Sequence, residues 1–352
     1  MTMVNGARAE TAAFQLLLNR SPLPSSMLAA VHSVEVSNEI DVPGMFSFKF
    51  NMLSQQGNWQ GADLDTFKPG DQVSVQMGVG QPRTLINAQI YSIDPDFDAY
   101  SLATISGFDT MASLRFGNHS RVFKGRNENQ IAEEVAASSR VRISAQGPPV
   151  TLNACVWQRQ QTNYHFLLSR SKLLNYELVV DGLTLLYRPS AAGLSPVKTL
   201  NFPRDVKRVN LRLRVPTEGS EVKMLGFDPA TNRAISAQSN PNTVRARMGG
   251  SESGYDFIDS FPSAAITVMD PTITRVEALQ SRANAEYMQN LNGFIEGDAE
   301  LEGDPSLVAG VNVRLSGLSQ RFDGIYYVRA SRHRYDDSTG YHTSLQLRRT
   351  GA

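Results

Sequence analysis

The chain is poor in cysteine, in net charge and in long hydrophobic runs. Cys155 is the only cysteine among 352 residues, which excludes an intrachain disulfide framework and fits folding in a reducing compartment. The 34 Lys and Arg balance the 34 Asp and Glu, so no bulk attraction to nucleic acid or to an anionic membrane is expected. No apolar run is long enough to span a bilayer, and the N-terminal segment lacks a signal-peptide layout. These absences predict a soluble, neutral protein of about two to three domains.

Motifs of common catalytic and metal sites are also missing from the sequence. It contains no Gly-x-Ser-x-Gly elbow, no His-Glu-x-x-His and no Walker loop. Asp94, Asp96 and Asp98 alternate, but the glycine and the terminal glutamate of an EF-hand are absent, so the run indicates a turn rather than a calcium site. The remaining histidines outside the C-terminal segment are isolated: His32, His119 and His165. We therefore expect no metal, no cofactor and no enzymatic activity.

What is present is mainly β-structure with an α+β insertion. Residues 1–110 predict a first small antiparallel barrel, because "MFSFKF" and "QVSVQM" alternate apolar and polar residues. Residues 111–200 predict an α+β domain with two short helices, the first capped by Asn127 with Gln130 and the second by Thr162. Residues 201–352 return to strands and predict a second barrel. A long helix of about 271–292, with Asp270 as N-cap, is expected to be inserted into it.

The two β-rich regions also suggest an internal duplication. Gly70 precedes Val73 and Val75, and Gly310 precedes Val313 and Leu315. A later strand opens at Tyr100 in the first region and at Tyr341 in the second, each after an Asp-rich turn. Upstream, "AVHSVEVSNEIDVPGMFSFKF" and "RVNLRLRVPTEGSEVKMLGFD" share a strand–turn–strand outline. The pattern predicts two similar barrels.

The segment "RASRHRYDDSTGYHTSLQLRR" concentrates two histidines near the C-terminus. Alternation predicts a hairpin with its turn at 336–340, in which His333 and His342 both lie on the polar face. Two nitrogen ligands are too few for a zinc site, and the nearest carboxylates belong to the turn. We predict that this hairpin carries no metal.

Several of these segments resemble the tail-hub proteins of contractile phages and phage-like injection systems. That family includes late-control D proteins and the hub half of type VI valine–glycine repeat spike proteins. The resemblance is carried by their order along the chain: "FKPGDQVSVQMG", "YHFLLSRSKLLNYELVVDG", "EALQSRANAEY", "EGDAELEGDPSLVAGVNVRLSGL" and "FDGIYYVRASRHRYDDSTGYHTSLQLRR". The usual acidic residue before the second helix is replaced here by Gln161, Thr162 and Asn163.

The resemblance implies a structural homotrimer whose paired barrels form a pseudo-sixfold ring between a hexameric tail tube and a trimeric spike. No run of short β-repeats follows before Ala352, so the spike is expected to be a separate protein. The other implied partners are the tube and further baseplate proteins, with assembly in the bacterial cytoplasm and no nucleic-acid specificity. The ring contacts are expected near Gly70, Val73, Val75, Tyr100, Gly310, Val313, Leu315, His333, Tyr341 and His342. A tail-tip cell-wall hydrolase and a carbohydrate- or oligonucleotide-binding barrel protein remain as alternatives.

Overall fold

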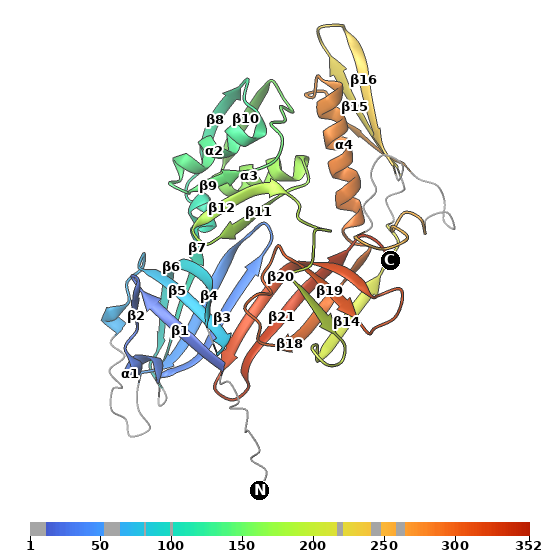
Figure 1. Cartoon of the computed structure of the whole chain (residues 1–352). Helices are drawn as coiled ribbons and strands as arrows, with labels where there is room; N and C mark the ends of the chain where they lie inside the picture. Colours follow the sequence, from blue (N-terminus) through green and yellow to red (C-terminus); the bar gives the residue numbers. More distant parts are fainter. Residues whose placement is uncertain are drawn as a thin grey trace.

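The computed structural model describes residues 12–52, 64–80, 82–98, 101–216, 221–240, 248–257 and 265–352. The fold is mainly β, with few helices and one large sheet (Figure 1). The strands of this sheet follow the order β14-β18-β21-β20-β3-β4-β7-β6-β5-β1-β2, with β19 beside β20 and β13 beside β19. Every pair in the sheet is antiparallel except β13 with β19. Among the described residues, no helix is long and apolar enough to cross a membrane.

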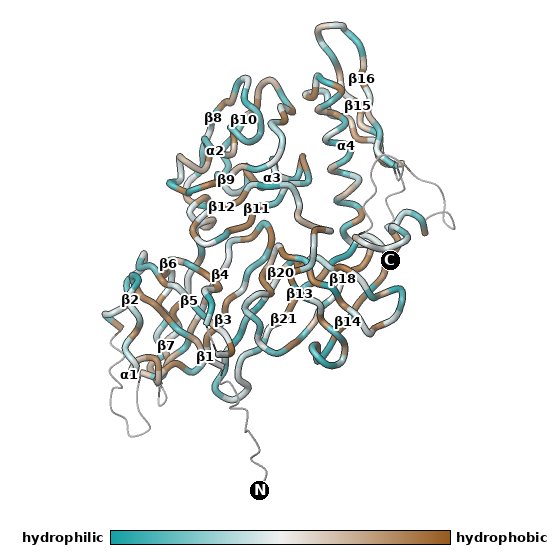
Figure 2. Tube along the Cα trace, in the orientation of Figure 1, coloured by the Kyte–Doolittle hydropathy of each residue, from teal (hydrophilic) through white to brown (hydrophobic). Residues whose placement is uncertain are grey.

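The first half of the sheet surrounds a core of its own. Phe46, Phe48 and Phe50 are buried, as their alternation in the sequence predicts, and every long strand of this half contributes to the same cluster. The alternation along the strands can be followed in Figure 2. The elements of this half are β1 (Ala12–Leu18), β2 (Ser21–Pro22), α1 (Ser25–Leu28), β3 (Val31–Glu39), β4 (Val42–Asn51), η1 (Leu64–Thr66), β5 (Gln72–Val79), β6 (Arg83–Asp96) and β7 (Leu102–Asp109).

The α+β segment forms separate small sheets above the large one (Figure 1). Both predicted helix caps are confirmed: Asn127 and Gln130 make a capping box, and the Thr162 hydroxyl accepts from the backbone N–H of His165. The segment contains η2 (Thr110–Arg115), β8 (His119–Lys124), α2 (Glu128–Ser138), β9 (Ile143–Ala145), β10 (Cys155–Gln161), α3 (Asn163–Leu173), β11 (Tyr176–Asp181) and β12 (Thr184–Pro189).

The second half of the sheet is interrupted by an insertion that projects away from it (Figure 1). The sheet strands are β13 (Lys198–Asn201), β14 (Arg208–Leu213), β18 (Ile295–Glu302), β19 (Asn312–Ser316), β20 (Gly324–Asp336) and β21 (Gly340–Arg349). Between β14 and β18 the chain forms a three-stranded sheet that packs on one helix: β15 (Glu221–Asp228), β16 (Arg233–Ser239), β17 (Ala265–Met269) and α4 (Val276–Leu291).

Two predictions fail in this region. The long helix begins at Val276 rather than near 271, because Asp270 caps a turn: its carboxylate accepts from the backbone N–H of Thr272. The segment "EVKMLGFD" is β15, which pairs with β16 and β17. The counterpart of β4 in the second half is therefore β18, which the insertion separates from β14 in the sequence.

The two halves repeat one strand order. The first half reads β3-β4-β7-β6-β5-β1 and the second reads β14-β18-β21-β20-β19-β13. Gly70 and Gly310 have φ values of 95° and 91°. The N–H of Gly70 donates to the carbonyl of Ile90, as that of Gly310 does to the carbonyl of Val328. A register shift follows at the same place in both, between Ile90 and Ser92 and between Val328 and Ala330.

The halves join through β20 and β3, which pair over Ala330–Asp336 and Ser33–Glu39. One continuous sheet results, and no barrel closed by strand pairing occurs among the described residues. The expectation of two separate barrels is thus corrected. The reason is that the last seven residues of β20 leave β19 and pair with the other half instead.

Candidate functional site

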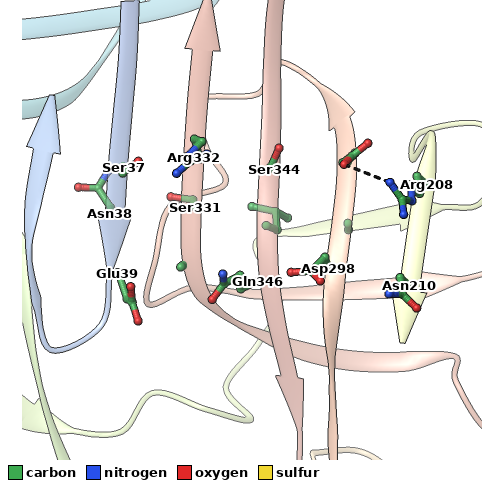
Figure 3. Close-up of a pocket in the computed structure, with 14 residues that line it drawn as sticks. Ser37, Asn38, Glu39, Arg208, Asn210, Asp298, Ser331, Arg332, Ser344 and Gln346 are labelled. Carbon is green, nitrogen blue, oxygen red and sulfur yellow. Dashed lines mark ion pairs between the residues drawn. The ribbon is translucent and has the colours of Figure 1, made fainter. Parts of the chain in front are cut away.

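The polar face of the sheet is hollowed across the junction of the two halves (Figure 3). The hollow is about 390 Å³ and is lined by β3, β20, β21, β18 and β14. Its side chains alternate with the buried ones along each strand, because successive residues of a strand point to opposite faces. The polar lining includes Asn38, Glu39, Arg208, Asn210, Asp298, Arg332, Ser344 and Gln346.

Charges of opposite sign meet across the junction. The Arg332 side chain lies 3.2 Å from the Glu35 carboxylate, and that of Arg329 lies 2.9 Å from Glu39. A further ion pair joins Arg208 on β14 to Glu300 on β18 at 3.8 Å. Exposed pairs of this kind contribute at most about 1 kcal/mol each. Their arrangement therefore determines which strands meet more than it determines how stable the sheet is.

His333 does not lie on this polar face, contrary to the prediction. The bulge between Val328 and Ala330 inserts an extra residue, so Ser331 and His333 turn into the core and Arg332 and Arg334 turn outward. His333 is fully buried and pairs across the hairpin with Thr343. The predicted pairing of His333 with His342 is wrong, because Arg334 stands opposite His342.

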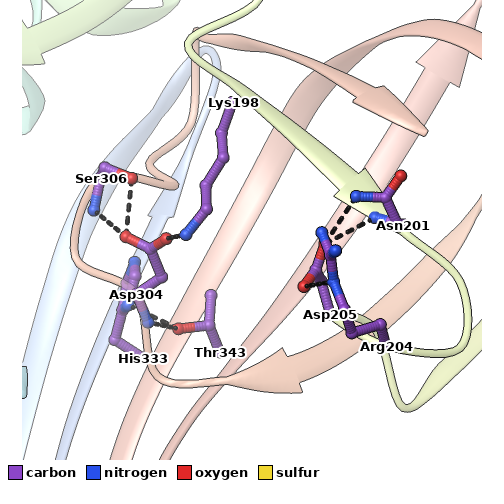
Figure 4. A network of polar contacts seen from close by, with 8 residues as sticks. All are labelled: Lys198, Asn201, Arg204, Asp205, Asp304, Ser306, His333 and Thr343. Atoms are coloured by element: carbon purple, nitrogen blue, oxygen red, sulfur yellow. Dashed lines mark hydrogen bonds and ion pairs between the residues drawn. The ribbon is translucent and has the colours of Figure 1, made fainter. Parts of the chain in front are cut away.

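The buried imidazole of His333 is fully hydrogen-bonded. Its Nε2 lies 3.2 Å from the Leu307 carbonyl, so this nitrogen carries the proton, and Nδ1 accepts from the hydroxyls of Tyr341 at 2.9 Å and Thr343 at 3.2 Å. Burial lowers the pKa of His333 to about 4. Thr343 also accepts from the backbone N–H of Asp304, which ties the β18–β19 loop to the hairpin (Figure 4). This site is structural and holds a neutral histidine.

The described part of the chain contains no cluster of metal-binding side chains. No group of three or more His, Cys, Asp or Glu side chains is placed to hold an ion. Asp94 and Asp96 lie within β6 instead of forming the predicted turn. His342 is half-buried and its Nε2 donates to the Thr339 carbonyl at 2.6 Å.

The other predicted contact residues fall into three groups. Val73, Val75, Val313, Leu315 and Tyr341 are buried in the two cores. Gly70 and Gly310 begin equivalent turns before β5 and β19. Tyr100 lies outside the described residues. The charged residues around the hollow were not predicted.

Sequence reasoning also missed the buried acids that connect the parts of the chain. Glu177 is buried and accepts from the Tyr327 hydroxyl at 2.6 Å and from Arg188 at 3.0 Å, which joins β11 to β20. Asp41, in the β3–β4 turn, accepts from the backbone N–H of Leu178, and burial raises its pKa to about 6. A single charge within an apolar strand, as in "NYELVV", was the available signal.

One family model matches residues 8–337 and is described as the Alg8 N-terminal domain. The chain belongs to the Alg8 N-terminal domain family. No curated protein matches this Alg8-family chain by sequence.

Solved structures similar to the Alg8-family chain are phage tail proteins and a secretion-system component. A tail protein of Neisseria meningitidis MC58 has a TM-score of 0.70 at 14% identity and covers 96% of each chain. The 43 kDa tail protein of prophage MuSo2 from Shewanella oneidensis has the same score and identity over 96% of this chain and 98% of its own. The Escherichia coli c3393 protein is a type VI secretion component similar to the bacteriophage T4 tail proteins gp27 and gp5. Its TM-score is 0.62 at 9% identity, and the match covers 96% of this chain and 77% of that protein. The resemblance to tail-hub proteins is thus confirmed at the level of the fold.

Proposed function

We propose that this protein is the structural hub in the baseplate of a contractile phage tail or a phage-like injection particle. Three copies form a ring that joins a hexameric tail tube to a trimeric spike. The protein is made in the bacterial cytoplasm and is incorporated into the particle with the other baseplate proteins. Its role is architectural, in keeping with its likeness to phage tail proteins.

The observation that carries this proposal is the repeat within the sheet. The two halves have the same strand order, the same glycine turn and the same bulge, and they join edge to edge. A trimer of such a chain presents six similar barrel-like halves around its axis. It can therefore match a sixfold partner on one side and a threefold partner on the other.

The polar hollow suits the wall of the central channel. The face opposite the two cores carries charged and amide side chains along five neighbouring strands, and it is the face that water or passing cargo would contact. A chain of the Francisella PdpA–VgrG complex has a similar fold, with a TM-score of 0.56 at 9% identity. That likeness supports a hub that carries further proteins.

Three regions are assigned within this hub: residues 1–110 and 201–352 as the two ring-forming domains, and residues 111–200 as the α+β domain. The residues first expected at ring contacts act through the strands that they support. Val73 and Val75 hold β5, and Val313 and Leu315 hold β19, against the two cores.

The test is the assembly state of the purified full chain. We expect native mass spectrometry to give three times the 38.7 kDa of one chain, and electron-microscopy class averages to show a ring with six lobes. A purified tube protein should bind one end of the ring. A monomer at every concentration, or a monomer that clears peptidoglycan in a zymogram, contradicts the hub.

A further inference from the structure

Among the strand edges that the described sheet leaves open, two involve the counterparts of the strands that form the internal junction: the outer edge of β14 and the end of β6. β14 pairs with β18 on one side and ends the sheet on the other. β6 pairs with β5 only through Gln89 in the ladder, while its pairing with β7 continues to Asp96. Within the described ranges, the last residues of β6 therefore have no strand beside them where β5 has ended.

The junction within the chain shows what an edge of this kind does. In the second half, β19 pairs with β20 only as far as Tyr327, and β3 then takes its place beside β20 from Ala330. β6 is the repeat counterpart of β20, and β14 is the counterpart of β3. The part of the chain that the structure describes thus contains one formed copy of a junction and two edges that correspond to the strands of another.

Positions on β6 follow from the shared bulge. Ser92 follows the bulge of β6 as Ala330 follows that of β20. Asp94 therefore corresponds to Arg332.

Positions on β14 follow from the ladders. Val34 pairs with Phe48 of β4, as Val209 pairs with Ala299 of β18. On the next strand of each half, Phe48 pairs with Ile105 and Ala299 pairs with Leu345. Ile105 lies two residues before Gly107, the partner of Ile90. Leu345 likewise lies two residues before Leu347, the partner of Val328. Val209 of β14 thus corresponds to Val34, and Arg212 to Ser37.

We propose that β6 of one copy pairs antiparallel with β14 of the next copy, with Asp94 opposite Arg212 and Asp96 opposite Asn210. This register transfers the formed pairs Arg332–Ser37 and Arg334–Glu35 to the second junction. The inference rests on the proposed trimer and identifies the strands and side chains that close its ring. The contact is head to tail, as a closed ring requires.

The polar face of this pairing is complementary in charge. Asp94 and Asp96 are exposed on β6, and Arg212 and Arg214 are exposed on β14 or directly after it. Neither arginine makes an ion pair within the described part of the chain. The register places Asp94 opposite Arg212, and places Asp96 between Arg212 and Arg208 on the diagonals. Opposite charges at such cross-strand positions attract.

The apolar face matches as well. Phe97 is 66% exposed. The register places it opposite Val209. In the formed junction the same positions hold Tyr335 and Val34, and Phe14 packs on Tyr335 with ring centroids 4.8 Å apart. An aromatic side chain exposed in one chain is thus covered by the next.

The two junctions carry opposite arrangements of charge. Within the chain the β20 side is basic and the β3 side is acidic, whereas between chains the β6 side is acidic and the β14 side is basic. An exchanged pairing of β6 with β3 would place Asp96 opposite Glu35, and one of β20 with β14 would place Arg332 opposite Arg212. Like charges oppose both exchanges, so the ring alternates its halves in one order.

Pro95 limits the number of backbone hydrogen bonds that β6 can form with β14. It has no N–H to donate, so its pair with Leu211 supplies at most one ladder hydrogen bond. A proline in an edge strand also weakens unspecific pairing with other edges. Side-chain complementarity therefore carries much of the specificity of this junction.

The first test is a disulfide trap in the full chain, with Cys155→Ser as background. Asp96→Cys with Asn210→Cys places the two thiols at facing positions, and mild oxidation should convert the trimer into a covalent trimer on non-reducing gels. The matched control is Asp96→Cys with Arg214→Cys, four residues out of register, which should stay monomeric on the gel. A native trimer whose in-register pair does not cross-link overturns the strand register and leaves the hub standing. A chain that is monomeric by native mass spectrometry overturns both.

The second test reverses the charges. Asp94→Arg and Arg212→Asp each replace an attraction with a repulsion at every junction of the ring, so each should raise the trimer dissociation constant by at least about tenfold. The double variant should bind more tightly than either single variant but short of the wild type, because the direct pair is restored while Asp96 and Arg214 then meet like charges on the diagonals. Both positions are exposed, and circular dichroism checks that the single variants fold. Single variants that assemble as tightly as the wild type, or a double variant that assembles no more tightly than either of them, contradict the pairing.

Discussion

The buried histidine of the C-terminal hairpin makes the stability of the protein depend on pH in a defined direction. His333 is fully buried, and its pKa is lowered from 6.5 to about 4, first by burial. Below pH 6.5 the unfolded chain binds a proton at this imidazole, and the folded protein does not bind one until about pH 4. The free energy of unfolding therefore falls as the pH falls through this window, and this contribution is fully present above pH 6.5.

The magnitude follows from the two pKa values. A separation from 6.5 to about 4 corresponds to about 3 kcal/mol, at 1.36 kcal/mol for each pH unit. His333→Gln removes the titrating group and keeps a neutral side chain that can hydrogen-bond. The variant should be less stable than the wild type at pH 8, because the glutamine cannot reproduce both contacts of the ring. Its disadvantage should shrink by about 3 kcal/mol between pH 7 and pH 4.

The assay is urea unfolding followed by far-ultraviolet circular dichroism at half-unit steps from pH 4 to pH 8. His32→Gln, at an exposed position, controls for the loss of an imidazole as such. A difference between wild type and His333→Gln that stays constant over the whole range would refute the reasoning. It would mean that His333 titrates alike in the folded and unfolded chains.

Three further predictions concern other buried or strained positions. Burial raises the pKa of Asp109 to about 7, so the free energy of unfolding falls as the pH rises from about 4 to about 7, where this carboxyl ionises in the unfolded chain but stays protonated in the folded protein. In the same urea series, Asp109→Asn should remove this fall, which amounts to about 4 kcal/mol. Gly70→Ala and Gly310→Ala should each cost about 1 kcal/mol or more in urea unfolding, because an alanine is strained at φ values of 95° and 91°; wild-type stability in either variant would contradict the repeated turn. Tyr327→Phe should cost about 2 kcal/mol, because the buried Glu177 carboxylate loses its shortest donor; an unchanged urea midpoint would show that this bond is dispensable.

Local patterns in the sequence were sufficient for many elements. Asn127 and Thr162 were assigned as helix caps correctly, because a cap depends only on residues within one helical turn. The alternation of Phe46, Phe48 and Phe50 identified a half-buried strand for the same reason. Gly70 and Gly310, each before an alternating strand, indicate the repeat from the sequence alone, and both have positive φ values.

Long-range pairing decided what these patterns left open. Nothing in the sequence near β14 shows that its partner is β18, since the insertion from β15 to α4 lies between them. The bulge beside Arg329 reversed the faces of the following residues and placed His333 in the core, because one extra residue shifts a strand by half its period.

The sequence by itself determined the mainly β class, the helix caps, the glycine turns and the resemblance to tail-hub proteins. Each of these depends on neighbours along the chain or on the order of segments. Only the tertiary structure decided that the two halves share one sheet, that Arg332 meets Glu35 across their junction, and that β14 and the end of β6 lie at edges of the described sheet. The physical reason is that strands pair through backbone groups common to every residue. Their partners are therefore selected by packing and charge across the whole fold.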